Sequence, residues 1–182
     1  IVSQRIGGDD DFEELSTPGS LNYRHQLGVL SDGALAVWVN NPDNYIIGDA
    51  SHPDHILFAR YVNVGDTWQP TSAVISDVVG LLDLKLATNG DHAALVYSLD
   101  TNGTVTSTND VELFYTTWNG TTWSAPTRLT NNNVPDERPQ LALAADGTPL
   151  LVWRQGGTLK FLKGAWNAAP VDLPVPGAAE RS

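Results

Sequence analysis

The sequence contains no cysteine and no methionine, and basic residues are scarce. The absence of cysteine excludes a thiol nucleophile, a disulfide framework and a zinc–thiolate site. Ten Lys and Arg against 21 Asp and Glu give a net charge of −11 at pH 7. We expect no nucleic-acid partner, because phosphate contacts need clustered basic side chains. We also expect no membrane span, since no apolar run approaches the ~18 residues that a spanning helix needs.

The rest of the composition is that of a globular protein, with 41% hydrophobic and 17% charged residues. Ile1-Val2 does not begin the apolar stretch that a secretory signal peptide requires. We therefore expect both ends of the chain to have been cut or processed.

One pattern occurs three times along the chain: an apolar strand, a turn with Asp-Gly or Asn-Gly, and an apolar strand that ends in an aromatic residue. The turns are Asp32-Gly33, Asn89-Gly90 and Asp146-Gly147, and the closing aromatics are Trp38, Tyr97 and Trp153. Each copy is followed by an apolar-aromatic run, a Gly and a Trp. Repeats of about 40–50 residues built only of strands are typical of propeller blades.

Asp-Gly or Asn-Gly between apolar strands predicts a β-hairpin, and no segment shows a sustained helical period. Each repeat therefore predicts four short strands, at 24–30, 35–39, 56–62 and 72–75, then 82–87, 93–98, 111–117 and 127–129, then 140–144, 150–154, 158–162 and 171–173. The segment 12–15 matches the last strand of a preceding blade.

The predicted fold is all-β, a partial β-propeller of three four-stranded antiparallel blades plus an orphan N-terminal outer strand. The boundaries are 1–23 for the orphan strand and junction, 24–79 for blade 1, 80–136 for blade 2, and 137–182 for blade 3 and the lead-out. Propellers close with four to eight blades, so three blades leave two open apolar faces. We expect neighbouring blades of a longer parent chain to cover them, or other copies that complete a ring.

The Gly-x-x-Trp turns resemble the Asp-box (BNR) repeat of sialidase-like propellers, Ser-x-Asp-x-Gly-x-Thr-Trp. The matches are Gly65, Thr67 and Trp68 in the first repeat, Gly120, Thr122 and Trp123 in the second, and Gly164 and Trp166 in a shorter third copy. Asn63 and Trp118 replace the Asp. The resemblance implies a structural turn, in which Gly permits the tight backbone and Trp packs between sheets.

A second similarity concerns Tyr23-Arg24-His25-Gln26-Leu27, which looks like the first-strand signature of sialidases, Tyr/Phe-Arg-Ile-Pro-x-Leu. In that family the Arg is one of three that bind the substrate carboxylate. Arg138 holds the same position in the third repeat, whereas the second repeat has no Arg near Leu81. The resemblance thus implies ligand binding by Arg24 and Arg138. The alternative is that both pair with nearby acids such as Asp136 or Glu137.

Two polar loops are further candidates. The loop from Asn40 to His55 offers contacts to a partner, through the polar and aromatic side chains of Asp43, Tyr45, Asp49, His52, Asp54 and His55. Within it, His52 and His55 are candidate metal ligands. The segment Asp100-Thr101-Asn102-Gly103 begins like a calcium loop but lacks the further ligands and closing Glu at the required spacing. We expect no cofactor, with calcium as the alternative.

We find no catalytic residues in the sequence. The hypothesis that follows is a non-catalytic recognition or adhesion module of a larger secreted or cell-surface protein, which binds protein or glycan. One alternative is a fragment of a sialidase-like glycoside hydrolase whose catalytic centre is completed by blades outside this chain. The other is a structural segment of an extracellular assembly.

Overall fold

The computed structural model of the chain describes residues 2–4, 12–103 and 109–173. These residues form strands, turns and loops, and none of them is helical, so no helix that could span a membrane occurs among them. The strands are β1 (Val2–Gln4), β2 (Phe12–Glu14), β3 (Leu21–Leu30), β4 (Gly33–Asn41), β5 (Asp54–Val62), β6 (Thr67–Trp68), β7 (Ser72–Val78), β8 (Leu81–Asn89), β9 (His92–Asp100), β10 (Val111–Trp118), β11 (Thr127–Arg128), β12 (Asp136–Leu143), β13 (Pro149–Gln155), β14 (Thr158–Lys163) and β15 (Val171–Asp172).

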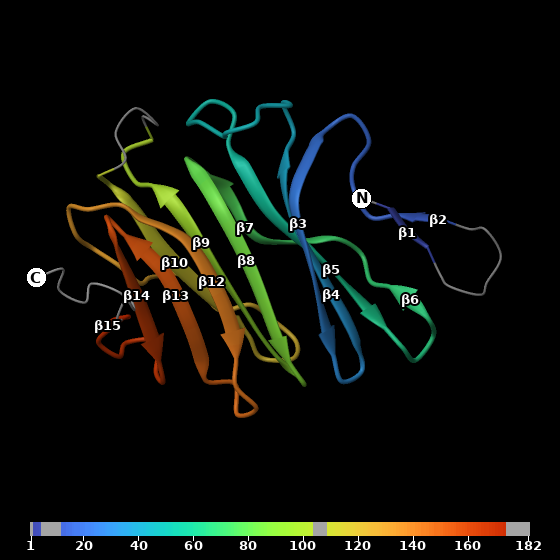
Figure 1. The fold of residues 1–182 in the computed structure, drawn as a ribbon. Coiled ribbons are helices and arrows are strands. Elements are labelled where there is room, and N and C mark those ends of the chain that lie inside the picture. Colours follow the sequence, from blue (N-terminus) through green and yellow to red (C-terminus); the bar gives the residue numbers. More distant parts are fainter. Residues whose placement is uncertain (1, 5–11, 104–108, 174–182) are drawn as a thin grey trace, which may run out of the picture.

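Three antiparallel sheets follow one another along the chain (Figure 1). Blade 1 consists of β3, β4 and β5, followed by two strands at its outer edge. These two strands, β6 and β7, both pair with β5, at opposite ends of it. Blade 2 is β8-β9-β10-β11, and blade 3 is β12-β13-β14-β15. The orphan strand β2 pairs with β1 as a separate two-stranded sheet. The chain is thus an all-β partial propeller, and the predicted fold class is confirmed.

All twelve blade strands predicted from the sequence are present, and the orphan strand is β2. Two strands were not predicted. Strand β6 is two residues long and lies inside a Gly-x-x-Trp turn, where the sequence indicates only the turn. Strand β1 is three residues long, too short to carry an alternating pattern.

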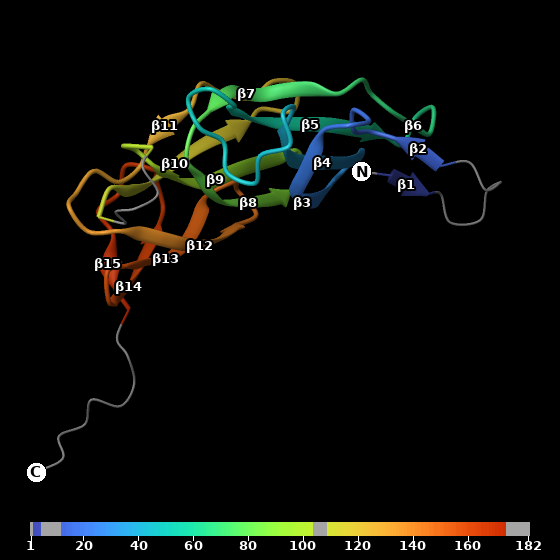
Figure 2. The same cartoon turned by 90° about the horizontal axis from the view of Figure 1, so that it is seen from above.

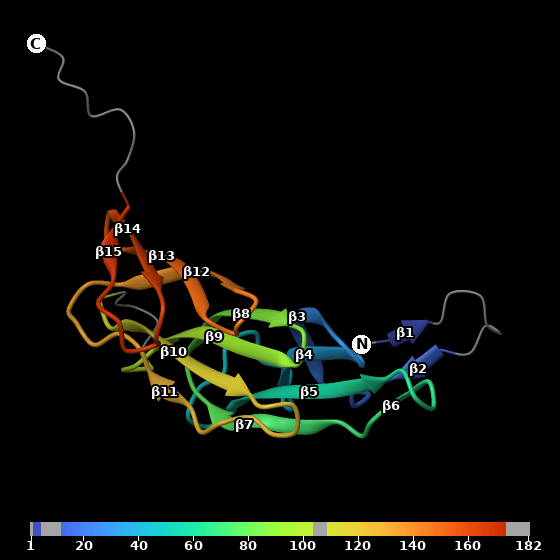
Figure 3. The ribbon, with the colours of Figure 1, turned by 90° about the horizontal axis from the view of Figure 1, so that it is seen from below.

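The three sheets spread like part of a fan (Figures 2 and 3). Strands β3, β8 and β12 neighbour one another on the inner side, whereas β7 and β11 lie on the outer side. The inner strands approach closely at Gly28, where a Cβ would lie 2.3 Å from the Thr88 side chain of β8. Glycine suits this close approach, because a Cβ would force the side chains of Thr88 and Leu86 to move.

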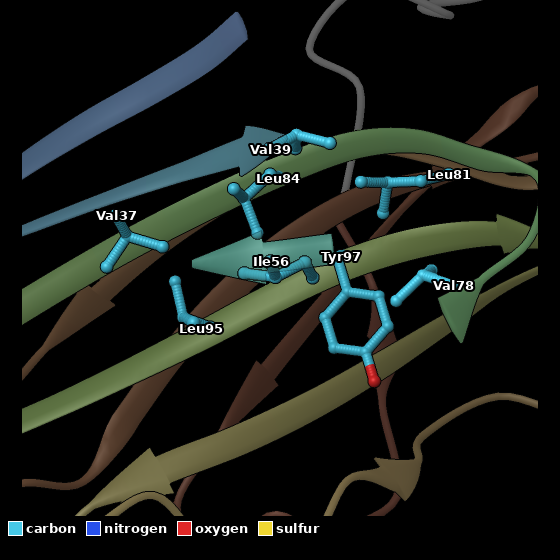
Figure 4. Packing of buried hydrophobic residues seen from close by; sticks show 8 residues of the cluster. All are labelled: Val37, Val39, Ile56, Val78, Leu81, Leu84, Leu95 and Tyr97. Atoms are coloured by element: carbon cyan, nitrogen blue, oxygen red, sulfur yellow. The ribbon is translucent and has the colours of Figure 1, made fainter. Parts of the chain in front are cut away.

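Apolar side chains from facing sheets fill the space between blades. Between blades 1 and 2, strands β4, β5, β7, β8 and β9 contribute the cluster shown in Figure 4, made of Val37, Val39, Ile56, Val78, Leu81, Leu84, Leu95 and Tyr97. Between blades 2 and 3 the cluster is Val96, Leu113, Leu151, Trp153 and Leu162. Because successive residues of a strand point to opposite faces, β9 packs on blade 1 with one set of residues and on blade 3 with the other.

The closing aromatics of the repeat occupy equivalent places in this packing. Trp38 packs with Leu15, which follows the orphan strand. Tyr97 packs on blade 1 and Trp153 on blade 2. Each blade therefore rests on the preceding unit through an aromatic side chain from its second strand.

Replacement of a leucine in the inter-blade core should unfold the module more readily than replacement of an exposed one. Leu95 is 0% exposed and Leu27 is 70% exposed. Leu95→Ala should lower the free energy of unfolding by about 2–5 kcal/mol, because it removes buried methyl groups and leaves a cavity. Leu27→Ala should change it by less than about 0.5 kcal/mol. Urea unfolding followed by tryptophan fluorescence measures both values, and equal losses would contradict the packing described here.

Candidate functional site

Arg24 and Arg138 occupy equivalent backbone positions on two inner strands. In blade 1, Arg24 and His25 stand opposite the single residue Trp38, and in blade 3, Arg138 and Pro139 stand opposite Trp153, so each Arg lies in a β-bulge. Both arginines have left-handed backbone angles, with φ of 52° and 53°. Such values are uncommon for residues other than Gly, Asn and Asp. Both positions lie near the start of strands that run in the same direction, at one end of the fan (Figure 1).

Neither guanidinium group forms an ion pair or hydrogen bond with the described part of the chain, and both arginines are exposed. The acids considered as their partners are engaged elsewhere. Asp136 accepts hydrogen bonds from Trp153 Nε1 at 2.6 Å, Gln155 Nε2 at 2.9 Å and Asn132 Nδ2 at 2.6 Å. Glu137 lies 3.9 Å from Arg154. The alternative in which Arg24 and Arg138 pair with nearby acids is therefore wrong for these two carboxylates.

Blade 2 differs at this position. Its bulge lies between Leu81 and Asp83, and the residue between them, Leu82, has no polar group to offer. The cation of this strand is Lys85, which lies 3.6 Å from Asp83. Arg24 and Arg138 therefore stand on the two inner strands that flank β8.

A tyrosine–carboxylate pair lies beside Arg24. Tyr23 donates a hydrogen bond from its hydroxyl to Asp54 Oδ2 at 3.0 Å, and the Arg24 guanidinium carbon lies 5.8 Å from the centre of the Tyr23 ring. Burial, followed by the negative charge of Asp54, raises the pKa of Tyr23 above its usual range. A tyrosine nucleophile needs a base that takes its proton. This environment instead favours the protonated phenol.

Four buried carboxylates lie at the same end as the two arginines. They are Asp54, Asp100, Glu112 and Asp136, each at most 2% exposed. Asp54 also accepts hydrogen bonds from Asn41 Nδ2 and Gly48 N–H, which fasten the loop between β4 and β5. Glu112 binds Arg128 at 3.1 Å and the Asn132 amide at 2.7 Å. These groups hold the loops of this end in place, since a buried charge without partners would be costly.

The predicted contact loop folds around its own polar groups. Tyr45 stacks on His52, with ring centroids 3.9 Å apart and planes at 12°. Asp49 accepts the amide N–H groups of Ser51 and His52, and these hydrogen bonds lower the pKa of Asp49. Asp43 is exposed. Asp54 is fully buried and bonded within the loop, so its prediction as a partner contact is corrected to a structural role.

The described residues offer no group of three or more carboxylate or imidazole side chains that converge as metal ligands. His52 Nδ1 lies 3.2 Å from Asp49, and His55 Nδ1 accepts the amide N–H of Asp77 at 3.2 Å. In the loop that begins like a calcium site, the Asp100 carboxylate accepts the amide N–H groups of Asn102 and Gly103. Residues 104–108 of this loop lie outside the described chain.

The Gly-x-x-Trp segments are turns that present a packed aromatic. Gly65, Gly120 and Gly164 have φ of 96°, 96° and 108°. The tryptophans pack on their own blades or across the neighbouring one: Trp68 against Tyr61, Trp123 against Phe58, and Trp166 stacked on Tyr115 at 4.2 Å. In the second turn Asn119, one residue after the Asp-box position, accepts the amide N–H groups of Thr121 and Thr122. Thr67 lies in the first of these turns and Thr122 lies in the second.

Sequence reasoning missed two features of this region. The Tyr23–Asp54 pair spans 31 positions, and nothing in the sequence couples the two residues except that Tyr23 precedes Arg24. A cavity lined by Tyr97 was also missed, since Tyr97 carries only the signal of a repeated core aromatic.

No family model and no curated protein matches the chain in sequence. Solved structures do match its fold. Trypanosoma rangeli sialidase in complex with 2,3-difluoro-KDN matches with a TM-score of 0.57 and 12% identity, over 90% of this chain and 31% of that one. The same enzyme in complex with sialic acid gives 0.56 and 11%, over 94% and 32%. A mutant of it that displays trans-sialidase activity gives 0.53 and 13%, over 79% and 28%.

These similarities show a sialidase-like propeller fold and nothing finer, because the identities are low. The chain spans less than a third of the length of the sialidase chains that it matches.

Two of the five tyrosines should ionise late in an alkaline titration. Burial raises the pKa of Tyr23 and of Tyr97 above the ordinary value of about 10. In the unfolded chain both phenols lose their protons near pH 10, so above that pH the folded protein binds more protons than the unfolded chain. The free energy of unfolding should therefore fall as pH rises beyond about 10.

Phenolate absorbance and urea unfolding at stepped pH measure the two effects. Tyr97→Phe should remove one late-ionising phenol and reduce the alkaline loss of stability. The assignment is wrong if no phenol ionises above the ordinary range while the protein is still folded.

Proposed function

We propose that this chain is a recognition module that binds an acidic glycan at the end of the propeller where the inner strands begin. The observation that carries the proposal is the pair of exposed, unpaired arginines in matching left-handed bulges, Arg24 and Arg138. A guanidinium group presents a planar set of donors that suits a carboxylate. Strained backbone at a rigid position is a recurring property of binding sites.

The ligand class follows from the combination of fold and chemistry. One of the matching structures is a sialidase in complex with sialic acid, a sugar acid. This chain has two unpaired guanidinium groups at one end of a similar fold, and its net charge of −11 disfavours anions elsewhere on the surface. A carboxylated sugar is therefore the ligand that the two arginines select best.

The setting of the module is part of the same proposal. A secreted or cell-surface location places a glycan-binding module where glycans occur. Neighbouring blades or chains cover the half-buried outer face of blade 3, where Leu150 and Val152 lie. A protein partner remains the alternative to a glycan, with the loop around Tyr45 and His52 as its contact.

The binding proposal predicts saturable binding of N-acetylneuraminic acid and none of the neutral sugar N-acetylglucosamine. Arg24→Gln and Arg138→Gln should each weaken binding by at least about tenfold, because each removes a charged hydrogen-bond donor. Arg154→Gln is the matched control, since Arg154 is 48% exposed and lies beside Glu137 on the same blade. Calorimetric titration measures the affinities, and thermal melts check folding. Failure of the acid to bind, or equal weakening by all three changes, would refute the proposal.

A second candidate function is that of a glycoside hydrolase fragment. The Tyr23–Asp54 hydrogen bond beside Arg24 favours it, because a tyrosine nucleophile on a carboxylate is one arrangement for such chemistry. The raised pKa of Tyr23 and the two further hydrogen bonds to Asp54 oppose it.

The two functions separate in a hydrolysis assay with a fluorogenic sialoside. We expect this chain to release no fluorophore above the buffer rate, since its phenol stays protonated. Release that Tyr23→Phe abolishes and Arg154→Gln retains would instead establish the enzyme.

A further inference from the structure

A cavity of about 610 Å³ opens between blades 1 and 2, and neither Arg24 nor Arg138 lines it. This volume falls within the range of about 300–1,000 Å³ that small-molecule sites occupy. Its walls come from the end of β7 and the connection to β8 on one side, and from β9, β10 and the segment around β11 on the other. Apolar side chains make most of the lining, among them Ile75, Val78, Leu99 and Phe114.

An unpartnered hydroxyl reaches this cavity from the core. Tyr97 is 2% exposed, and its ring stacks on Phe114 with centroids 5.7 Å apart. Its hydroxyl forms no hydrogen bond with any described residue, and the side chain lines the cavity. Figure 4 shows this hydroxyl pointing away from the other labelled side chains of the cluster. The Tyr97 oxygen is not among the buried polar atoms that lack a partner, so it is open to the cavity. A polar group of a ligand can therefore form a hydrogen bond with it.

Asp77 supplies an unpaired negative charge to the same cavity. Its backbone is left-handed, with φ of 56°, and its amide N–H is held by His55 Nδ1. Asp77 is exposed, and its carboxylate forms no hydrogen bond or ion pair with the described chain, so it is available to a ligand. Asp100, also in the lining, adds a second negative charge whose Oδ1 accepts two amide N–H groups.

Arg128 is the one basic residue among the described residues that line the cavity, and it does not attract an anion because its charge is already paired. Arg128 is fixed by a hydrogen bond from Nε to the Thr130 carbonyl at 2.8 Å and by an ion pair with Glu112 at 3.1 Å. Glu112 is fully buried, so its charge offsets that of Arg128. A negatively charged ligand would therefore meet the exposed carboxylate of Asp77.

We propose that this cavity binds an organic cation, an ammonium or guanidinium group on an apolar body. The apolar body fills the space between Val78, Leu99 and Phe114. The cationic group pairs with Asp77 and donates a hydrogen bond to the Tyr97 hydroxyl. This site is separate from the arginines and independent of the acidic-glycan proposal.

The test uses three probes of one shape and different charge: hexylammonium, 1-hexanol and hexanoate. Hexylammonium should bind saturably, with a dissociation constant on the order of millimolar for so small a ligand. The other two should bind at least about tenfold more weakly. Amide chemical shifts in the isotope-labelled chain report the affinity, and those of Leu99 and Gly103 should move. Equal binding of the three probes, or no saturable binding of any, overturns the proposal.

Variants then locate the cation. Asp77→Asn keeps a residue that tolerates the left-handed backbone and should weaken hexylammonium binding by roughly two- to fivefold, as expected for a partly exposed ion pair. Tyr97→Phe should weaken it by roughly two- to tenfold through loss of one hydrogen bond. Asp43→Asn, at an exposed site outside the cavity, is the control for net charge and should change nothing. If neither Asp77→Asn nor Tyr97→Phe weakens binding, the site is elsewhere and the proposal is wrong.

A fourth probe, N-acetyl-lysine N-methylamide, identifies the source of the cation. Binding at least as tight as that of hexylammonium assigns the site to a lysine side chain of a polypeptide. Binding of the alkylammonium alone assigns it to a small amine. Both results support an organic-cation site.

Discussion

The contact between one blade and the preceding unit is the constraint on which the rest of this molecule depends. Each blade makes it with an aromatic side chain of its second strand, Trp38, Tyr97 or Trp153. Burial of such a side chain removes about 150–250 Å² from water, worth roughly 4–6 kcal/mol at 25 cal/mol per Å². Because that contact is made face to face, the inner strands come so close that a Cβ at Gly28 would clash with the Thr88 side chain. The two bulged arginines are thereby brought to one end.

The same end is held by polar groups. Asp54 and Asp136 each accept three hydrogen bonds in a fully buried setting, and their donors come from loops as well as from strands. A buried carboxylate satisfied in this way is rigid, because the loss of any one donor leaves charge without compensation. The opposite end has simple hairpin turns such as Asp32-Gly33. The loops are therefore held in place at the end of the fan where the side chains of Arg24 and Arg138 are exposed.

The repeat and its strands were predictable because they depend on local signals: apolar alternation, Asp-Gly turns and spaced aromatics. Arg24 and Arg138 were found for a similar reason, since both stand at the same place in the repeat. What could not be predicted depends on contacts between distant residues. No local sequence signal indicates that Tyr23 pairs with Asp54 or that Asp54 is buried. The cavity beside Tyr97 also arises only when two blades meet.

The backbone conformation of Arg24 and Arg138 bears on what these residues do. Five residues other than glycine have left-handed angles in the described chain, and three of them, Asn44, Asp66 and Asp77, are of types that tolerate this conformation. Arginine does not, and the conformation costs it roughly 1–2 kcal/mol. Glycine would fit the bulge without strain, and neither arginine stabilises the fold through an ion pair with the described chain. The Arg24 guanidinium carbon lies 5.8 Å from the centre of the Tyr23 ring, whereas Arg138 makes no such ring contact within the described chain. Under the binding proposal, contacts of both guanidinium groups with the ligand offset the strain.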